Sequence, residues 1–250
     1  MSITSRTSSY LRFASGLAGL RSGDVFLASF PRSGNTWVRF FLCNLISLCE
    51  WDGREVDFSL LNQTMPELGV DNLLARWPHP TIPRVVKTHQ RYRFVFGRRA
   101  SIGIIRDPRD VMVSYYHFTH DRKRIYSGSF AQFIRHPRYG LPSWFAHYAS
   151  WRSRWSVVVR FEDMLEDPLR ELRRILEVLD VQPPDEVVEE AVSRASLGTL
   201  RRAESRETAK AQYAAFARSG TSGQWKAYFS DEDSAHYVEL AKLHGAGVYV

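Results

Sequence analysis

The sequence predicts an α/β fold with three layers, in which helices cover both faces of a central parallel sheet. Two observations support this prediction. Short apolar segments alternate with helix-like segments along the chain, and two of the helices begin with capping residues shortly after a strand. Parallel strands need a crossover connection, usually a helix, and both faces of such a sheet are covered.

Four strands are expected, each leading into a loop or a helix. Their ranges are Val25–Ser29, Arg84–Lys87 with its flanks, Ser101–Ile105 and Val157–Phe161. The first strand passes through a loop rich in Pro, Ser and Gly into a helix over roughly Thr36–Cys49. Strands alternating with helical segments predict a parallel sheet.

Two later helices have recognisable starts. After the third strand, Asp107 can act as the N-cap, Pro108 stands at the first helical position, and Asp110 completes an acidic first turn. The pair Asp167-Pro168 repeats this signal. A helical stripe that we expect in the core follows it, formed by Leu169, Leu172, Leu176 and Leu179.

The length of 250 residues suits a single domain, with residues 1–23 as an N-terminal extension, a short helix around Tyr10–Leu20 or a targeting segment. Cys43 and Cys49 lie six apart in one predicted helix, so no mutual disulfide is expected and a reduced, cytoplasmic protein is predicted. No apolar run is long enough to span a membrane. Two longer segments, Trp51–Pro83 and Asp121–Tyr148, could lie over one edge of the sheet as substrate loops.

The charge balance favours anionic partners. The formal net charge is 34 − 27 = +7, and such a charge attracts nucleotides, nucleic acid, or sulfated and phosphorylated substrates. Seven basic residues without an acidic one lie in mid-chain, which predicts a local positive field: Arg84, Lys87, Arg91, Arg93, Arg98, Arg99 and Arg106.

The loop Ser29–Trp37 is a candidate phosphate site, because it joins a strand to a helix N-terminus. Small residues allow backbone N–H groups to approach an anion there. Arg32 adds a bidentate cationic donor, whereas Ser33, Asn35 and Thr36 add neutral ones. The alternative is a plain turn that uses Gly34 for its geometry. No Gly-Lys-Ser/Thr triplet opens the helix, so this is not a Walker A sequence.

Lys87 and His89 form a second candidate site. Residues two apart in a strand share a face, and this strand ends where ligands bind in open α/β sheets. His89 is therefore a candidate general base.

Arg106 and Ser114, which follow the third strand, form a third candidate site and could bind one phosphate together. The alternative is an Arg106–Asp110 ion pair with Ser114 packed in the helix.

A second glycine-containing loop, Arg218–Lys226, could close on a phosphate, or it could be a solvated loop. Three strand ends and this loop bring cationic groups to one side of the sheet.

With these sites, the chain resembles the cytosolic-type sulfotransferases that use 3′-phosphoadenosine 5′-phosphosulfate (PAPS). The resemblance runs from about Asp24 to Phe229, through four motifs in family order: FPRSGNTW at 30–37, KTH at 87–89, RDPRDVMVSYYHF at 106–118 and RSGTSGQWK at 218–226.

The resemblance implies a P-loop-NTPase-like fold, a sulfuryl transfer with release of 3′-phosphoadenosine 5′-phosphate (PAP), and no metal. Lys87 and Arg32 would stabilise the transferring group, and His89 would be the catalytic base. The 5′-phosphosulfate loop would comprise Arg32, Ser33, Gly34, Asn35, Thr36 and Trp37, with Trp37 near the adenine. The remaining nucleotide contacts would be Arg106, Ser114, Arg218, Ser219 and Gly220 to the 3′-phosphate, and Ser196 and Leu197 to the adenine.

Four features depart from the family pattern. Arg32 stands where many members have Lys, and its planar fork differs from a point charge. Phe161 replaces a Tyr that hydrogen-bonds the adenine, and Ser219 replaces a Lys of the 3′-phosphate site. No dimerisation motif is recognisable in Ala227–Asp233, so the oligomeric state stays open.

The acceptor is expected to be a small molecule or a glycan, with no nucleic acid partner and no stable membrane insertion. Phe58, Trp77, Tyr139, Trp144 and Phe145 favour an aromatic or lipidic alcohol, unless most of them are core. Arg122, Lys123, Arg124 and Arg138 favour an anionic sugar or peptide. Two other functions remain open: a P-loop kinase with a degenerate anion loop, which would depend on Mg²⁺, and a basic RNA- or heparin-binding protein, whose affinity would fall steeply with salt.

Overall fold

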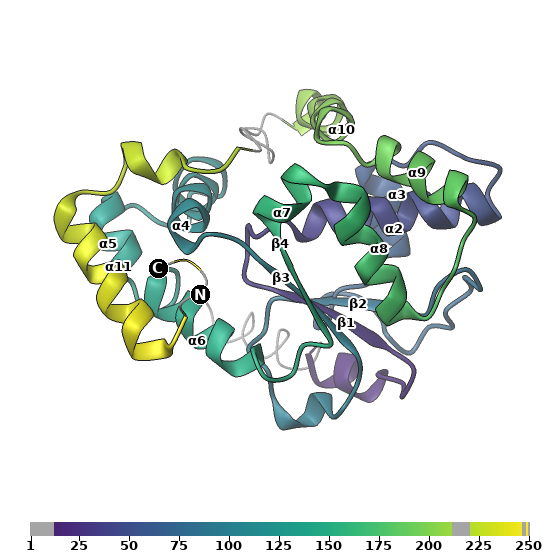
Figure 1. Cartoon of the computed structure of the whole chain (residues 1–250), viewed down its shortest axis with the longest axis horizontal. Coiled ribbons are helices and arrows are strands. Elements are labelled where there is room, and N and C mark those ends of the chain that lie inside the picture. Colours follow the sequence, from purple (N-terminus) through teal and green to yellow (C-terminus); the bar gives the residue numbers. More distant parts are fainter. Residues whose placement is uncertain (1–12, 212–220, 247–248, 250) are drawn as a thin grey trace.

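The computed structural model of the chain describes residues 13–211, 221–246 and 249. Within these ranges four parallel strands form one sheet in the order β2-β1-β3-β4, at the centre of Figure 1. The strands are β1 Val25–Ser29, β2 Val85–Thr88, β3 Ser101–Ile105 and β4 Val157–Arg160. The predicted parallel sheet is confirmed. β4 ends one residue earlier than predicted, because Phe161 begins helix α7 (Phe161–Glu166).

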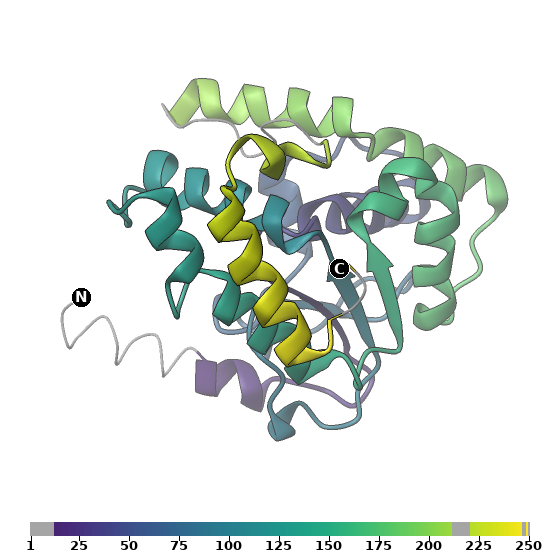
Figure 2. The same ribbon diagram turned by 60° about the vertical axis from the view of Figure 1, so that its left-hand side comes forward.

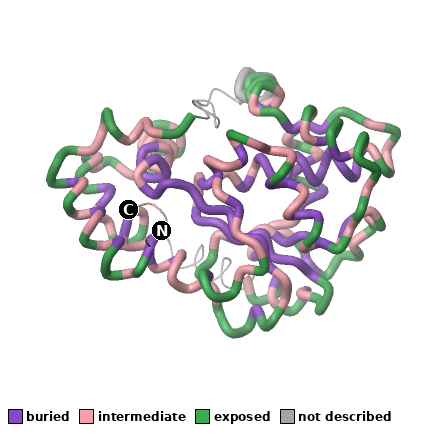
Figure 3. Tube along the Cα trace, viewed as in Figure 1, coloured by how far each residue is buried: buried purple, intermediate pink, exposed green. Residues whose placement is uncertain are grey.

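The strands supply the two inner faces of a three-layer core. Along β1, Val25 and Leu27 join an apolar cluster with α2 (Asn35–Glu50), α8 (Pro168–Leu179) and α9 (Asp185–Arg194), whereas Phe26 and Ala28 join another with Phe96 and Trp151. Alternate residues of a strand point to opposite faces, so both faces of the sheet are covered. Figure 3 shows the buried strands between the exposed outer turns of the helices. The predicted α/β/α fold is confirmed.

The predicted helix starts are also confirmed. The side chain of Asp107 accepts a hydrogen bond from the Arg109 amide at the start of α4 (Pro108–His117), and that of Asp167 accepts one from the Arg170 amide at the start of α8. The leucine stripe of α8 faces the core, with Leu172, Leu176 and Leu179 buried and Leu169 packed against the same cluster.

A third apolar cluster lies beside the sheet. It joins α4 to α5 (Phe130–Arg135), α6 (Leu141–Trp151) and α11 (Asp231–His244), which lie together on the left of Figure 1. The predicted substrate segment 121–148 contributes α5 and most of α6 to this cluster. By contrast, the segment 51–83 reaches the edge strand β2, where Glu67 forms a parallel bridge with Lys87.

The remaining elements connect these layers. They are α3 (Phe58–Thr64), η1 (Phe94–Phe96), η2 (Phe118–Arg122), α10 (Leu197–Ala211) and η3 (Gln224–Ala227), together with a helical stretch at residues 13–18.

Cys43 and Cys49 are both free thiols, as predicted. In the ranges with a described structure, no helix has the length and apolarity needed to cross a membrane.

The basic run between Arg84 and Arg106 does not form a single field. Arg84 is buried, where its Nε and Nη2 donate to the carboxylate of Asp24 at 2.8 and 2.7 Å. Lys87 and Arg106 line a cavity at the carboxyl ends of the strands, whereas Arg93 and Arg98 are exposed around η1. The prediction of one positive field is therefore wrong, because the chain crosses from one end of the sheet to the other between β2 and β3.

Candidate active site

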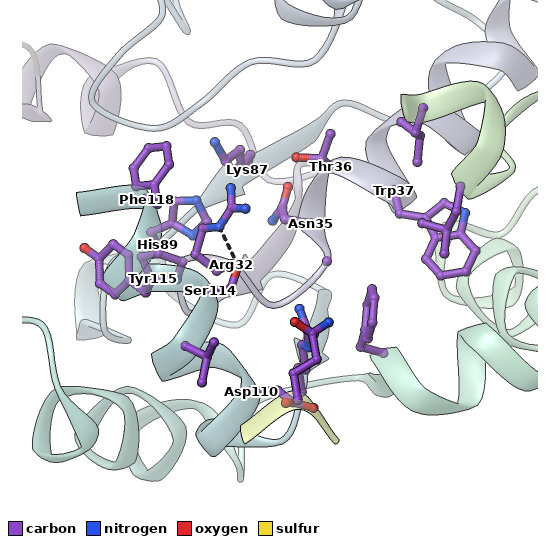
Figure 4. A pocket seen from close by; sticks show the side chains of 18 of the residues that line it. Arg32, Asn35, Thr36, Trp37, Lys87, His89, Asp110, Ser114, Tyr115 and Phe118 are labelled. Atoms are coloured by element: carbon purple, nitrogen blue, oxygen red, sulfur yellow. Dashed lines mark hydrogen bonds between the residues drawn. The ribbon is translucent and has the colours of Figure 1, made fainter. Parts of the chain in front are cut away.

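A cavity of about 350 Å³ lies at the carboxyl ends of β1, β2 and β3. Pockets of a few hundred cubic ångströms accommodate small molecules. Figure 4 shows the side chains that converge on it from the loop before α2, from β2 and from α4. Ten of the residues predicted from the sequence line it: Arg32, Gly34, Asn35, Thr36, Trp37, Lys87, His89, Arg106, Ser114 and Leu197.

The loop before α2 has the backbone of an anion-binding turn. Arg32 and Gly34 both have left-handed conformations, with φ of 71° and 108°. A Cβ at Gly34 would lie 2.7 Å from Cδ2 of Phe161, so this position requires glycine. Within the described part of the chain, no side chain caps the first turn of α2, and the buried Oγ of Ser33 has no hydrogen-bond partner. Backbone and hydroxyl donors therefore remain available to an anion.

Asn35 has a structural role that the sequence did not predict. It lines the cavity, but its Nδ2 donates to the Leu27 carbonyl at 3.4 Å and to the Ser29 Oγ at 3.1 Å. Its side chain therefore holds the loop against β1. Trp37 packs edge-on against Phe161, with ring centroids 5.8 Å apart, and both rings border the same part of the cavity.

His89 lies just beyond β2 with a defined tautomer. Its Nδ1 is 2.7 Å from the backbone oxygen of Ser29. A carbonyl oxygen only accepts, so Nδ1 carries the proton and Nε2 keeps a lone pair. Burial lowers the pKa of His89 to about 3, and the positive charge of Lys87 adds to this effect. The ring is therefore neutral near pH 7, which is the form that a general base needs.

Lys87 makes a contact that the sequence did not predict. Its Nζ lies 2.7 Å from Oε2 of Glu67, whose backbone is bridged to β2. Burial lowers the pKa of Lys87, and the carboxylate of Glu67 opposes that shift. No sequence pattern could reveal this pair, since the two residues meet only because the segment 51–83 folds along the sheet edge.

Arg32 connects the loop to α4. Its Nε donates to the Oγ of Ser114 at 3.0 Å, and its guanidinium lies 5.1 Å from the centre of the Phe118 ring. The dashed line in Figure 4 marks this hydrogen bond. Arg32 and Ser114, which were predicted for different ends of the nucleotide, are thus in contact in this structure.

Arg106 and Asp110 organise the opposite wall. Nη2 of Arg106 donates to the Thr221 carbonyl at 3.0 Å, and its guanidinium lies 4.4 Å from the centre of the Phe161 ring. Among the residues that the structure describes, its Nε has no hydrogen-bond partner. Burial lowers the pKa of Arg106, which the charge of Asp110 opposes. A buried cation with an unsatisfied donor is suited to an anionic ligand.

Asp110 does not form the Arg106 ion pair considered as an alternative. Its Oδ2 accepts hydrogen bonds from the amide of Gly223 at 2.7 Å and the hydroxyl of Ser222 at 3.2 Å, and its Oδ1 accepts one from the amide of Trp225 at 3.0 Å. The start of α4 thereby holds the end of the second glycine-containing loop. The sequence indicated Asp110 as a first-turn acid or as a partner of Arg106, and it did not indicate this contact.

The other predicted nucleotide contacts have varied outcomes. Leu197 lines the cavity at the start of α10, together with Leu200. Ser196 is exposed and is not part of the lining, and its Oγ accepts from the Thr199 amide at 3.4 Å. Arg218, Ser219 and Gly220 lie outside the described residues, so their predicted roles remain untested.

Most of the predicted acceptor aromatics are not in the cavity. Phe58 lines it, but Trp144 and Phe145 are buried core, Tyr139 packs against the same cluster, and the Nε1 of Trp77 donates to the Ile82 carbonyl. Tyr115 and Phe118, on α4 and directly after it, provide the aromatic wall instead. Both belong to the Ser-Tyr-Tyr-His-Phe segment, whose position beside Ser114 could have indicated them.

A second buried histidine adjoins His89. His147 on α6 is 3 % exposed, its Nε2 has no hydrogen-bond partner, and its ring lies edge-on to Phe30. Burial lowers the pKa of His147 to about 3, and His89 and Arg91 lower it further. His147 also belongs to no predicted site.

These two histidines predict an acid-sensitive fold. Their folded pKa values lie below the unfolded value of about 6.5, so between about pH 3 and 6.5 the unfolded chain binds protons that the folded chain does not. The free energy of unfolding should fall as the pH drops through 6.5, by up to about 2 kcal/mol per histidine between pH 7 and 5. Urea unfolding at several pH values in this range measures that change. In His147→Asn, the free energy of unfolding should fall less steeply with decreasing pH than in the parent. An unchanged slope would contradict the assignment.

Comparisons with known proteins agree with this geometry. The sequence matches the family model described as "Sulfotransferase domain" over residues 22–244. It is 28 % identical over 257 residues to Sulfotransferase 1E1 of Cavia porcellus, covering 89 % of this chain and 84 % of that protein. It is 29 % identical over 241 residues to Sulfotransferase 6B1 of Mus musculus, covering 91 % and 78 %.

Solved structures share the fold. A mouse sulfotransferase, SULT7A1, complexed with PAP superposes with a TM-score of 0.68 at 22 % identity, covering 94 % of this chain and 89 % of that one. A retinol dehydratase in complex with androsterone and the inactive cofactor PAP superposes with a TM-score of 0.73 at 20 % identity, covering 95 % and 85 %. The solved structures share the α/β fold, and the family match defines the chain as a transferase. The chain belongs to the sulfotransferase domain family, which confirms the predicted resemblance to PAPS-dependent sulfotransferases, and it is a sulfotransferase enzyme.

Proposed function

We propose that the chain transfers the sulfuryl group of PAPS by a single in-line displacement to a hydroxyl, or less readily an amine, of a small-molecule, lipid or glycan acceptor, and releases PAP. The observation that carries this proposal is the position of His89. Its Nδ1–H is fixed on the Ser29 carbonyl, so the Nε2 lone pair is free to act as a base in the cavity that also contains Lys87 and Arg32.

The unsatisfied donors of the cavity suit a nucleotide phosphorylated at both ends of its ribose. At one end, the loop before α2 has the Ser33 hydroxyl without a partner and uncapped helix amides. At the other end, Arg106 keeps a buried Nε without a partner. Trp37, Phe161 and Leu197 provide apolar surface for a base. Burial of such donors without partners costs free energy, and anionic oxygens would remove that cost.

PAPS supplies the activated sulfuryl group and a leaving phosphate. His89 removes the proton from the acceptor, which contributes about 10²–10⁴ in rate. Lys87 and Arg32 stabilise the negative charge that develops on the leaving oxygen, assisted by the amides at the start of α2. For Lys87 to do so, its Nζ must exchange the Glu67 carboxylate, now 2.7 Å away, for that oxygen. Negative charge beside Lys87 and Arg32 also raises the pKa of His89 and makes it a stronger base.

The acceptor side favours an aromatic or lipidic alcohol over an anionic one. Tyr115, Phe118 and Phe58 line the cavity next to His89 and Lys87. Of the basic residues that suggested an anionic acceptor, Arg122 and Lys123 lie 5.8 Å from the centre of the Phe118 ring. They flank the aromatic wall but are not part of the cavity lining. The acceptor's hydroxyl therefore meets an apolar surface before it reaches His89.

A nucleotide competition tests the proposed donor. PAP should bind more tightly than 5′-AMP, by about tenfold or more, because Arg106 and Ser114 gain a charged partner only from the 3′-phosphate. The ratio should be the same with Mg²⁺ and with EDTA. Equal affinities for PAP and 5′-AMP would overturn the 3′-phosphate site. A preference for ATP that requires Mg²⁺ would favour the kinase alternative instead.

A further inference from the structure

Exposed apolar side chains gather at the end of the sheet opposite the cavity. Among the described residues, six large hydrophobic side chains are exposed, and four of them belong to η1 and to the segment 70–74: Val70 at 62 %, Leu74 at 62 %, Phe94 at 94 % and Val95 at 50 %. Phe94 and Val95 form the single turn η1, which ends at Gly97 with a φ of 66°. In Figures 1 and 2, η1 and the helical stretch 13–18 lie side by side below the sheet.

Several contacts connect these segments to one another. The guanidinium of Arg93 lies 5.1 Å from the centre of the Phe13 ring, and Phe13 packs close to Gly69, next to Val70. On the other side, Nε of Arg99 donates to the Arg21 carbonyl at 2.7 Å, and Nη2 of Arg21 donates to the Leu74 carbonyl at 3.5 Å. These contacts connect η1, the helical stretch 13–18 and the segment 69–74, which together carry the four exposed apolar side chains or adjoin them.

This face is basic as well as apolar. Arg21, Arg93 and Arg98 are exposed on it, and residues 84–106 contain no acidic side chain. Three acidic side chains lie in or next to the same segments, and each has a partner. Asp24 is 2 % exposed and paired with Arg84 at 2.7 Å, the half-buried Asp71 accepts a hydrogen bond from the Glu67 amide at 2.7 Å, and Glu67 pairs with Lys87 at 2.7 Å. None of these arginines lines the cavity. The sulfotransferase reaction therefore does not explain this part of the mid-chain basic run.

We propose that this face docks the enzyme on an anionic phospholipid surface, with Phe94 and Val95 inserted at the level of the headgroups and the arginines paired with lipid phosphates. Peripheral proteins combine exposed apolar side chains with surrounding cations in this way. The cavity lies at the other end of the sheet, so the docked enzyme would keep its active site facing water.

Two features favour a lipid surface over other partners. Phe94 is 94 % exposed on the single turn η1, and a soft interface accommodates such a protruding ring better than a flat rigid surface. A symmetric pairing of two copies through this face would bring its arginines against one another, and that repulsion disfavours a homodimer. Single-stranded nucleic acid also binds aromatic and basic groups, but Val70, Leu74 and Val95 offer no stacking surface for bases.

Sedimentation with lipid vesicles tests the proposal. The full chain should bind vesicles of phosphatidylcholine with 30 % phosphatidylserine, a composition chosen as roughly that of an anionic membrane surface, and should bind pure phosphatidylcholine weakly. Phe94→Asp should lower the partition coefficient at least about tenfold. Arg93→Glu and Arg98→Glu should each lower it about fivefold or more. Leu243→Asp is the matched control, since Leu243 is 75 % exposed on α11, a helix that packs on α6 in the third apolar cluster, and it should bind as the parent does.

The outcomes separate docking from misfolding and from other partners. Each variant should retain parental affinity for PAP, which shows that the fold and the cavity are intact. Equal vesicle binding by Phe94→Asp and the parent would overturn the proposal. So would a dimer that Phe94→Asp dissociates, or binding to single-stranded RNA that exceeds vesicle binding and needs the arginines but not Phe94.

Discussion

Replacing His89 with asparagine is expected to lower kcat for acceptor sulfation about 10²–10⁴-fold, the range that a positioned general base contributes. Asparagine can retain the hydrogen bond to the Ser29 carbonyl, now made by Nδ1 at 2.7 Å, but it has no group at the place of Nε2. The loop before α2 should therefore keep its shape while the base is lost. Initial rates with saturating PAPS would measure the effect.

Nucleotide binding distinguishes loss of the base from loss of the site. The affinity for PAP should change by less than about twofold in His89→Asn, because a neutral ring contributes little to binding an anion. His244→Asn is a matched control, since its ring stacks on Phe145 away from the cavity. If His89→Asn sulfated an acceptor at the parental rate while Lys87→Ala did not, His89 would not be the base.

Replacing Asp110 with alanine is expected to raise the Kd for PAP about 100-fold. This carboxylate is 2 % exposed and accepts three hydrogen bonds from residues 222–225. Charged hydrogen bonds contribute about 1.5–3 kcal/mol each, and 2.7 kcal/mol corresponds to about a 100-fold change in affinity. Without Asp110, the carbonyl of Thr221 that fixes Arg106 loses its support. Calorimetric titration with PAP would measure the change.

The asparagine variant provides a sharper comparison. In Asp110→Asn, one oxygen becomes an amide donor facing a backbone N–H, so binding should weaken nearly as much although the shape is preserved. Asp185→Ala removes an exposed acid that pairs with Arg173 at 2.7 Å on the far side of α8, and it should leave PAP binding unchanged. Parental affinity in both Asp110 variants would show that the loop is held by other contacts.

The parallel sheet and the edge that carries the site could be predicted because local sequence patterns indicate them. Apolar segments at Val25–Ser29 and Ser101–Ile105 are buried at every position, and Asp107 and Asp167 cap helices within three residues of themselves. Lys87, His89, Arg32 and Arg106 could be assigned to one edge because parallel strands share the polarity that places their carboxyl ends together.

The errors arise where contacts depend on long-range folding. Arg84 belongs to the same basic run as Lys87, yet it is buried with Asp24, 60 residues away. Glu67 meets Lys87 and Asp110 meets Gly223 over 20 and 113 residues. Trp144 and Phe145 looked like acceptor residues, but α6 packs them against α11. Such side chains are polar or aromatic whether they line a site or the core, so composition alone does not separate them.

Transfer of labelled sulfate from [³⁵S]PAPS tests the central claim most directly. Purified chain would be incubated in EDTA with phenols, lipid alcohols, glycans and tyrosyl peptides, beside His89→Asn as the control. The proposed mechanism predicts label in at least one hydroxyl acceptor, most readily an aromatic or lipidic alcohol, at the same rate with and without EDTA and greatly reduced in the variant. An acceptor labelled as fast by His89→Asn as by the parent, or one labelled only when Mg²⁺ is present, would contradict it.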